Sequence, residues 1–503
     1  MAFEIKKMKV FRKIVLPKTQ IQKECEIEIG IDISKILSAT SAVSLISSEV
    51  KDGEILYTAQ ISSCVIYLTN EMEIGSANSI CEYSGKINDS HIKEGDKTIL
   101  SLSVKDSNID FSNACAIIKL DIEEMVELFV QKEVKTIDSF DDDICTQKGN
   151  MVLEKFHASA EKEVFTEDEF AVKKNIKKII SLESSAIIND CETEKNMVTV
   201  TGETLSRVVY LTDDDKFEDA YVKAAFKEEV EVENTEEKMK AICKANVDLK
   251  NSVTELLESD KGTKISVKIP LRLNLYIFSE EEIDVVEDLY STQNEIALSS
   301  ESFDMTKICK SENLESKIDG SLVLSDEKPR IDKIIFNGGN SVNVTNSYIE
   351  NKELFVEGIV KTTVVYLNDD EGTLNSVEIE IPFVSSDKIG VEGEAVACVD
   401  AVLYDVDVSV KRGREIMFDG KVKMTARICY DEISATITSA EKGEEFIEKD
   451  CAMMYVFGKT GESLWSVAKR NKIKQEQLIA QNSDVSFPLI QDTGFILFFQ
   501  KTL

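Results

Sequence analysis

Histidine, proline and tryptophan are scarce in this sequence, and the scarcity of histidine excludes several classes of site. Among 503 residues there are 2 histidines, His91 and His157, 5 prolines and 1 tryptophan. Two histidines leave almost no material for a Cys/His zinc site or for a Ser-His or Cys-His catalytic pair. We therefore expect no enzymatic activity and no metal or other cofactor, and we expect both histidines to be ordinary surface or turn residues.

Paired cysteines and long apolar runs are also missing. The 11 cysteines are scattered and form no C-x-x-C pair, which is typical of free thiols in a reducing compartment. No stretch approaches the ~20 apolar residues of a membrane span, and the N-terminus lacks the apolar core of a secretory signal. We expect a cytoplasmic protein that does not insert into membranes.

Positively charged residues are outnumbered by acidic residues over most of the chain. Lys and Arg number 59 against 93 Asp and Glu, a net charge of −34. Such a charge repels nucleic acid, so we expect no nucleic acid partner. Residues 452–503 depart from this balance, because they contain five Lys and one Arg against four Asp and Glu. The shift indicates a separate small domain at this end.

An internal repeat is the most informative feature that is present. Two short motifs recur three times: "ISKIL", "IKKII" and "IDKII" at 33–37, 176–180 and 331–335, then "CVIYLTNE", "RVVYLTDD" and "TVVYLNDD" at 64–71, 207–214 and 363–370. From the first isoleucine to the tyrosine the separations are 34, 34 and 35 residues. Tyr67, Tyr210 and Tyr366 therefore mark equivalent positions, and we interpret them as core or rim residues that precede solvated acidic turns.

Each repeat has the pattern of β-strands. β-branched residues cluster before polar turns, and "TKISVKIPLRLNLYIF" at 263–278 alternates apolar and polar residues, which buries one face of a strand. Gly202, Gly358 and Ala59 stand eight residues before the tyrosines, and a small residue there indicates a bulge or a close approach of strands.

These patterns predict a mainly β protein with three repeated antiparallel modules, each a sandwich or a partly open barrel. We place the repeats at 1–145, 165–292 and 325–440, followed by a small domain at 452–503. Because each module is large enough for a core of its own, we expect beads with few mutual contacts.

The small domain begins with a Gly-Lys-Thr triplet at 458–460, which raises the question of a phosphate-binding loop. Such a loop needs a glycine five positions earlier, and that position is Met453. Instead, "MYVF" predicts a strand. Ser463 is expected to cap a first helix that has Leu464, Val467 and Ala468 on one face, and a second helix is expected to turn Leu478 and Ile479 inward. "DTGFILFF" predicts the last strand of the domain. The predicted order is βααβ.

This stretch resembles the LysM domain. "GESLWSVA" matches the family pattern at Gly461, Leu464, Trp465, Ser466, Val467 and Ala468, and "LIAQN" matches it at Leu478 and Asn482. The chain departs from the pattern at Glu462, Ser463 and Ser483 and in "DTG" at 492–494. These positions border the groove in which LysM domains hold N-acetylglucosamine chains.

Three β repeats before a terminal LysM domain also resemble the SipL and SpoVID group of spore coat morphogenetic proteins, whose repeats are of the DUF3794 type. The resemblance implies a non-enzymatic scaffold in the mother cell of endospore-forming bacteria. It would tether the spore coat to the forespore surface by binding a coat-assembly ATPase, and other coat proteins, through its LysM-like end. The alternative is a cell-wall protein that binds the N-acetylglucosamine of peptidoglycan.

The candidate residues for partner or glycan binding all lie in the LysM-like domain. Lys469, Arg470, Lys472 and Lys474 cluster beside Trp465, the only tryptophan. We weigh a protein-binding face for an acidic partner against simple packing of the tryptophan and favourable placement of cations at a helix C-terminus. The candidate residues are Gly461, Glu462, Ser463, Leu464, Trp465, Lys469, Arg470, Lys472 and Asn482.

Overall fold

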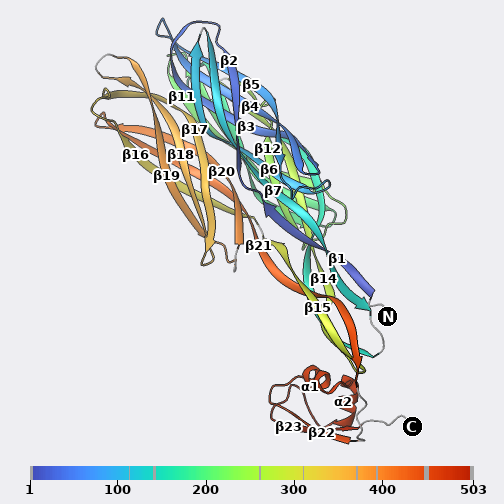
Figure 1. Cartoon of the computed structure of the whole chain (residues 1–503). Coiled ribbons are helices and arrows are strands. Elements are labelled where there is room, and N and C mark those ends of the chain that lie inside the picture. The colour runs from blue at the N-terminus through green and yellow to red at the C-terminus, as the bar shows by residue number, and fades with distance from the viewer. Residues whose placement is uncertain are drawn as a thin grey trace.

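The structure is a computed structural model of the whole chain (Figure 1). It describes residues 4–112, 114–139, 143–259, 262–309, 311–369, 372–391, 395–446 and 453–498. Twenty-one strands form three modules, and two further strands and two helices form the C-terminal domain. The predicted mainly β architecture with a small βααβ end is therefore confirmed.

Seven strands make up each module. Module 1 contains β1 (Glu4–Val15), β2 (Thr19–Glu28), β3 (Ile33–Lys51), β4 (Glu54–Thr69), β5 (Ile74–Asn88), β6 (Lys97–Ser112) and β7 (Cys115–Ser139). Module 2 contains β8 (Ile144–Val172), β9 (Ile176–Glu194), β10 (Met197–Thr212), β11 (Phe217–Glu231), β12 (Lys240–Val247), β13 (Val253–Ser259) and β14 (Gly262–Ser291). Module 3 contains β15 (Asn294–Ile308), β16 (Glu312–Val323), β17 (Ile331–Glu350), β18 (Glu353–Asn368), β19 (Leu374–Lys388), β20 (Ala395–Lys411) and β21 (Glu415–Glu445).

Every module is a sandwich of two antiparallel sheets. A three-stranded meander, β3-β4-β5 in module 1, faces a sheet built on the long last strand, β1-β7-β2 with β6 also paired to β7. Modules 2 and 3 repeat this plan with β9-β10-β11 facing β14 and β17-β18-β19 facing β21. The alternating residues of β14 confirm the strand prediction, because all seven from Ile265 to Ile277 are buried.

The small residues before the repeated tyrosines lie at bulges, as predicted. The register between β9 and β10 shifts at Thr201 and Gly202. A side chain on Gly202 would collide with the Phe226 ring and the Ile187 carbonyl oxygen. Gly358 has the same relation to the Phe383 ring. The three repeated tyrosines are buried in the cores that these strands form.

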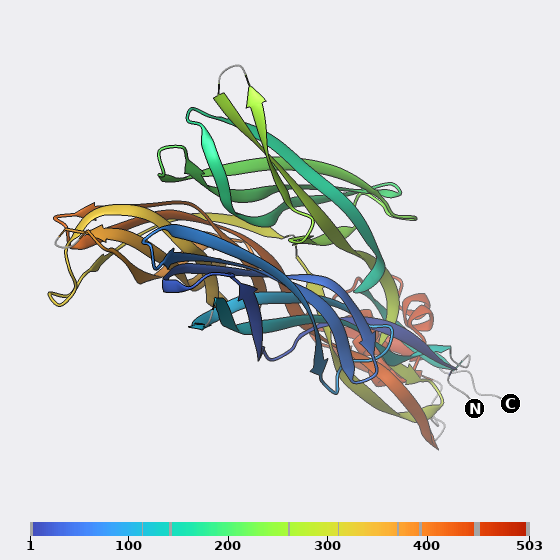
Figure 2. The ribbon, with the colours of Figure 1, turned by 90° about the horizontal axis from the view of Figure 1, so that it is seen from above.

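The three modules share buried contacts, so the expectation that they have few mutual contacts is wrong. Four buried clusters each take residues from all three modules; one joins Phe11 and Phe129 to Phe278 and to Cys429. Seen from above, the blue, green and orange modules gather around one another (Figure 2). The strands also fill stretches that we placed between repeats, since β8 begins at Ile144 and β15 at Asn294. The exact limits of the repeats as folding units stay a prediction.

Beyond the sandwiches, the chain forms a stalk made of three two-stranded ribbons. Each ribbon pairs the C-terminal half of a long strand with the strand that opens the module: β7 with β1, β14 with β8 and β21 with β15. Shared clusters hold the ribbons together, one of them containing Ile137, Leu289 and Ile437. Figure 1 shows the LysM-like domain at the far end of this stalk.

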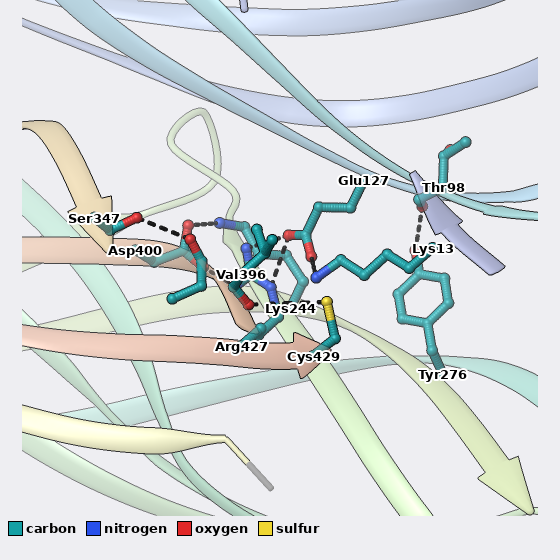
Figure 3. A network of polar contacts seen from close by, with 11 residues as sticks. Lys13, Thr98, Glu127, Lys244, Tyr276, Ser347, Val396, Asp400, Arg427 and Cys429 are labelled. Atoms are coloured by element: carbon teal, nitrogen blue, oxygen red, sulfur yellow. Dashed lines mark hydrogen bonds and ion pairs between the residues drawn. The ribbon is translucent and has the colours of Figure 1, made fainter. Parts of the chain in front are cut away.

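A buried chain of charges crosses the contact between the modules (Figure 3). The Glu127 carboxylate accepts a hydrogen bond from the Arg427 Nε at 2.8 Å and pairs with the Lys13 Nζ at 2.6 Å. Arg427 also binds Asp400, and Lys244 of module 2 donates to Asp400 at 2.6 Å. Three cations and two carboxylates from the three modules thus alternate along this chain. Lys13, Glu127 and Arg427 are buried, whereas Lys244 and Asp400 are partly exposed.

Mutual charge keeps this network ionised in spite of burial. Burial alone would raise the pKa of Glu127, but the positive charges of Arg427 and Lys13 outweigh it and lower the pKa from 4.5 to about 2. The pKa of Asp400 is also lowered, because Arg427 and Lys244 outweigh the effect of its burial. Both carboxylates are therefore charged at neutral pH.

Removing one charge should destabilise the whole body. We expect Arg427→Met to lower the free energy of unfolding by about 3–5 kcal/mol, since it leaves Glu127 buried beside one cation only. Lys317→Met, which removes the exposed ion pair with Asp419 on the same sheet, should leave it nearly unchanged. Urea denaturation of both variants makes the comparison, and similar midpoints would contradict this role of Arg427.

The network also predicts a loss of stability in acid. Because the folded-state pKa of Glu127 lies below its ordinary value of 4.5, its contribution is complete above about pH 5 and disappears as the pH falls towards 2. The difference in melting temperature between the natural chain and Glu127→Gln should therefore be largest near neutral pH and shrink below pH 5. A difference that does not change with pH would contradict the assignment.

Candidate protein-binding site

The LysM-like domain is built from two strands and two short helices. Strand β22 (Met453–Gly458) pairs with β23 (Thr493–Phe498), and helices α1 (Leu464–Asn471) and α2 (Gln475–Gln481) connect them. Ser463 caps α1 as predicted, its hydroxyl accepting a hydrogen bond from the Ser466 N–H at 3.2 Å. The helix ends at Asn471, and the C-cap residue Lys472 has a left-handed backbone.

The core of this domain agrees with the predicted helix faces at all but one position. Val467, Ala468 and Leu478 are buried, and Leu464 packs against the same cluster. Ile479 was expected to point inward, but it is 49% exposed. It follows Leu478 by ~100° around a helix that buries a single residue, so it turns to solvent.

The predicted binding residues separate into three groups, the first of which holds the domain together. Asn482 is buried; its amide nitrogen donates to the Leu478 and Ile496 carbonyls, and its oxygen accepts from the Ile496 N–H at 2.9 Å. Ser463 and Leu464 form the cap and part of the core. These three positions of the LysM pattern are explained by folding.

The second group joins the loop of Gly461 and Glu462 to the loop of Leu489, and we call these two loops the lip of the domain. The Gly461 N–H donates to the Leu489 carbonyl at 2.7 Å, and the Leu489 N–H donates to the Glu462 carbonyl at 3.0 Å. The Glu462 carboxylate binds the Arg470 guanidinium, which holds the pKa of Glu462 below its usual value. Thr460, the last residue of the Gly-Lys-Thr triplet, donates through N–H and hydroxyl to Asp492.

The third group docks the domain on the stalk. The Trp465 indole N–H donates to the Asp288 carboxylate at 2.8 Å, and the Lys469 Nζ donates to the same carboxylate at 2.5 and 2.7 Å. The Trp465 ring meets the Tyr290 ring edge to face at 4.9 Å. Lys472 lies 5.0 Å above the Phe446 ring. The tryptophan and two of the cations therefore contact the chain's own β14 and the residue that follows β21.

Docking also shapes the electrostatics of these groups. Burial raises the pKa of Asp288, but hydrogen bonds from Lys469 and Trp465 outweigh it and lower the pKa below the ordinary value. The Tyr290 hydroxyl donates to the Ile473 carbonyl at 2.7 Å, and burial raises its pKa. Asp288 thus stays charged and keeps the ion pair at neutral pH.

The sequence prediction missed an apolar face on the other side of the small sheet. Five large apolar side chains of β22 and β23 point away from the helices and are exposed: Met453, Tyr455, Phe457, Ile496 and Phe498. Val456 and Phe495, on the opposite face, pack into the core. The pattern of "MMYVFG" indicates a strand with one buried and one exposed face. It does not tell which of the two faces is covered by the rest of the domain.

The comparisons with known proteins agree with this architecture. The family described as "SipL, SPOCS domain" matches residues 175–254 and 317–411, and the LysM domain family matches residues 459–491. The chain is SipL-like, with a LysM domain at its C-terminal end. The two SPOCS matches fall in modules 2 and 3, and module 1 repeats their strand order. No curated protein and no solved structure matches the chain.

These domains fit a scaffold protein of the spore coat or one that binds peptidoglycan. SPOCS and LysM domains are non-catalytic binding domains, and the SipL family suggests association with the spore coat. In the described part of the chain, no three His, Cys, Asp or Glu side chains gather as a metal site. Within the same residues, no helix has the length and apolar composition needed to cross a membrane.

Removing the Asp288 carboxylate should release the LysM domain. Asp288→Ala deletes the acceptor for Trp465 and Lys469, and each hydrogen bond to a charged group contributes about 1.5–3 kcal/mol. Because Trp465 is the only tryptophan, its emission should shift to longer wavelength and acrylamide should quench it more strongly. Asp284→Ala, an exposed change on the same strand, is the control. Unchanged emission of Asp288→Ala would show that this carboxylate does not hold the domain.

Proposed function

We propose that this chain is a non-enzymatic scaffold of spore coat assembly. It acts in the mother cell, at the forespore surface, where its LysM-like end binds a coat-assembly ATPase and other coat proteins. The interlocked modules and the stalk support this role, because they share buried clusters and hold the LysM domain at one end of the molecule (Figure 1). The family matches to SPOCS and LysM domains support the process.

The observation that carries the proposal is the exposed apolar face of β22 and β23. Tyr455 is 58% exposed and Phe457 69%, and their rings meet edge to face at 5.0 Å. Contiguous apolar surface of this kind marks sites of protein association, and aromatic side chains dominate the energy of such interfaces. We place the centre of the partner site here.

A charged rim borders this face on the side of the predicted site. The Arg470 guanidinium donates to the Phe457 carbonyl at 2.9 Å while it binds Glu462. In this arrangement Glu462 and Arg470 contact the partner at the edge of the apolar face. Trp465, Lys469 and Lys472 support binding indirectly, because they hold the domain on the stalk.

Peptidoglycan binding is a second candidate function, and the LysM match at residues 459–491 favours it. A glycan would approach the lip formed by Gly461, Glu462 and Leu489. Two main-chain hydrogen bonds join the loops there, and the Thr460 hydroxyl is bound to Asp492. These internal bonds compete with hydrogen bonds to a sugar, so we rank glycan binding below protein binding.

The test is partner capture by the full-length chain from sporulating cells. Changing Tyr455 and Phe457 together to serine should reduce capture of an ATP-hydrolysing coat protein, identified by mass spectrometry, by at least about tenfold, since anchors of this kind contribute about 2 kcal/mol or more. Ile433→Ser, at a 75% exposed position on β21, is the matched control and should capture normally.

The same variants separate the two functions when they are sedimented with insoluble peptidoglycan. Protein binding predicts that the natural chain stays in the supernatant. If the natural chain sediments with peptidoglycan and the double serine variant still captures protein normally, the results contradict the coat-scaffold proposal and support the cell-wall function. An unchanged melting temperature of the variant confirms that it is folded.

A further inference from the structure

Two cysteines of module 1 meet between its sheets. Cys25 lies on β2 and Cys81 on β5, 56 residues apart in the sequence, and their Sγ atoms are 3.1 Å apart. Strand β2 belongs to the sheet built on β7, whereas β5 is the edge of the meander. Cys25 is 1% exposed, and Cys81 is partly exposed. The two thiols are therefore in contact, and one of them can be reached from solvent.

We propose that Cys25 and Cys81 form a site of oxidative modification, in which a peroxide converts the two thiols into a disulfide that links the two sheets of module 1. The Sγ atoms need to approach by only about 1 Å to reach the bond length of about 2.05 Å. This inference goes beyond the scaffold function and does not depend on it.

The reaction balances with hydrogen peroxide as the oxidant. The Cys81 thiolate attacks one peroxide oxygen, the O–O bond breaks, and a sulfenic acid and hydroxide form. The Cys25 thiol then attacks the Cys81 sulfur, the S–O bond breaks, and the S–S bond forms. In total two thiols and one peroxide give one disulfide and two molecules of water.

The surroundings of the pair make this reaction slow at neutral pH. Burial, together with the contact to Cys25, raises the pKa of Cys81 from 9.0 to about 12. Since the thiolate is the reactive species, the rate should rise with pH. A slow reaction is consistent with thiols that stay reduced until the protein meets an oxidant for a long time.

A second pair follows the same plan in module 2. Burial and the contact with Cys191 on β9 together raise the pKa of Cys243 on β12, and these strands also belong to different sheets of one sandwich. Module 3 differs, because Cys398 and Cys429 lie on β20 and β21, which pair within one sheet. The inter-sheet arrangement is thus a feature of modules 1 and 2. We assign the site to Cys25 and Cys81 because their Sγ atoms are already in contact at 3.1 Å.

The experiment treats the full reduced chain with hydrogen peroxide at pH 7 and pH 9, blocks the remaining thiols and maps peptides by mass spectrometry. We expect a peptide pair linked through Cys25 and Cys81, formed faster at pH 9, and a melting temperature that rises by several degrees because the cross-link restricts the unfolded chain. Reduction should reverse both changes.

Two variants keep the test decisive. Cys81→Ser should abolish the linked peptide and the rise in melting temperature, whereas Cys64→Ser, on the neighbouring strand β4, should leave both. If the natural chain at pH 9 yields Cys25 and Cys81 only as free thiols or as separate sulfinic acids that are not linked to each other, the proposal is overturned. Linkage of either cysteine mainly to a different cysteine overturns it as well.

Discussion

The buried pairing of Glu127 with Arg427 is the interaction on which the rest of the structure depends. Taking these charges out of water is costly, and their attraction offsets that cost only when both partners are in place. Glu127 belongs to module 1 and Arg427 to module 3, and Asp400 extends the chain of charges to Lys244 of module 2. A module that shifted in register would leave a charge unpaired in the interior.

The three repeats carry different residues at the position of this pair. Glu127, Tyr276 and Arg427 stand at the same place in "VELF", "LYIF" and "ARIC", and the residues two positions later, Phe129, Phe278 and Cys429, share one buried cluster. Identical copies packed around a common axis would bring three equal side chains together. An acid, a tyrosine and an arginine complement one another instead, so the centre selects one arrangement of the modules.

The stalk transmits this arrangement to the LysM domain. Two of its three ribbons continue strands that carry the buried charges, β7 with Glu127 and β21 with Arg427. The third contains β14, which ends with Asp288 and Tyr290 against Trp465. Four of the residues selected from the sequence as a binding face, Trp465, Lys469, Arg470 and Lys472, therefore have internal partners. The outer face of β22 and β23 is left uncovered on the same small domain.

The sequence by itself determined the local structure, because hydrophobic period, turn residues and caps act over a few neighbouring positions. The strands around Tyr67, Tyr210 and Tyr366, the bulges beside Gly202 and Gly358, and the Ser463 cap could all be predicted. Only the tertiary structure decided that the modules share a core, that Trp465 faces Asp288 some 177 positions away, and that Ile479 turns outward. These outcomes depend on which surfaces meet, and no pattern within one repeat records its neighbours in space.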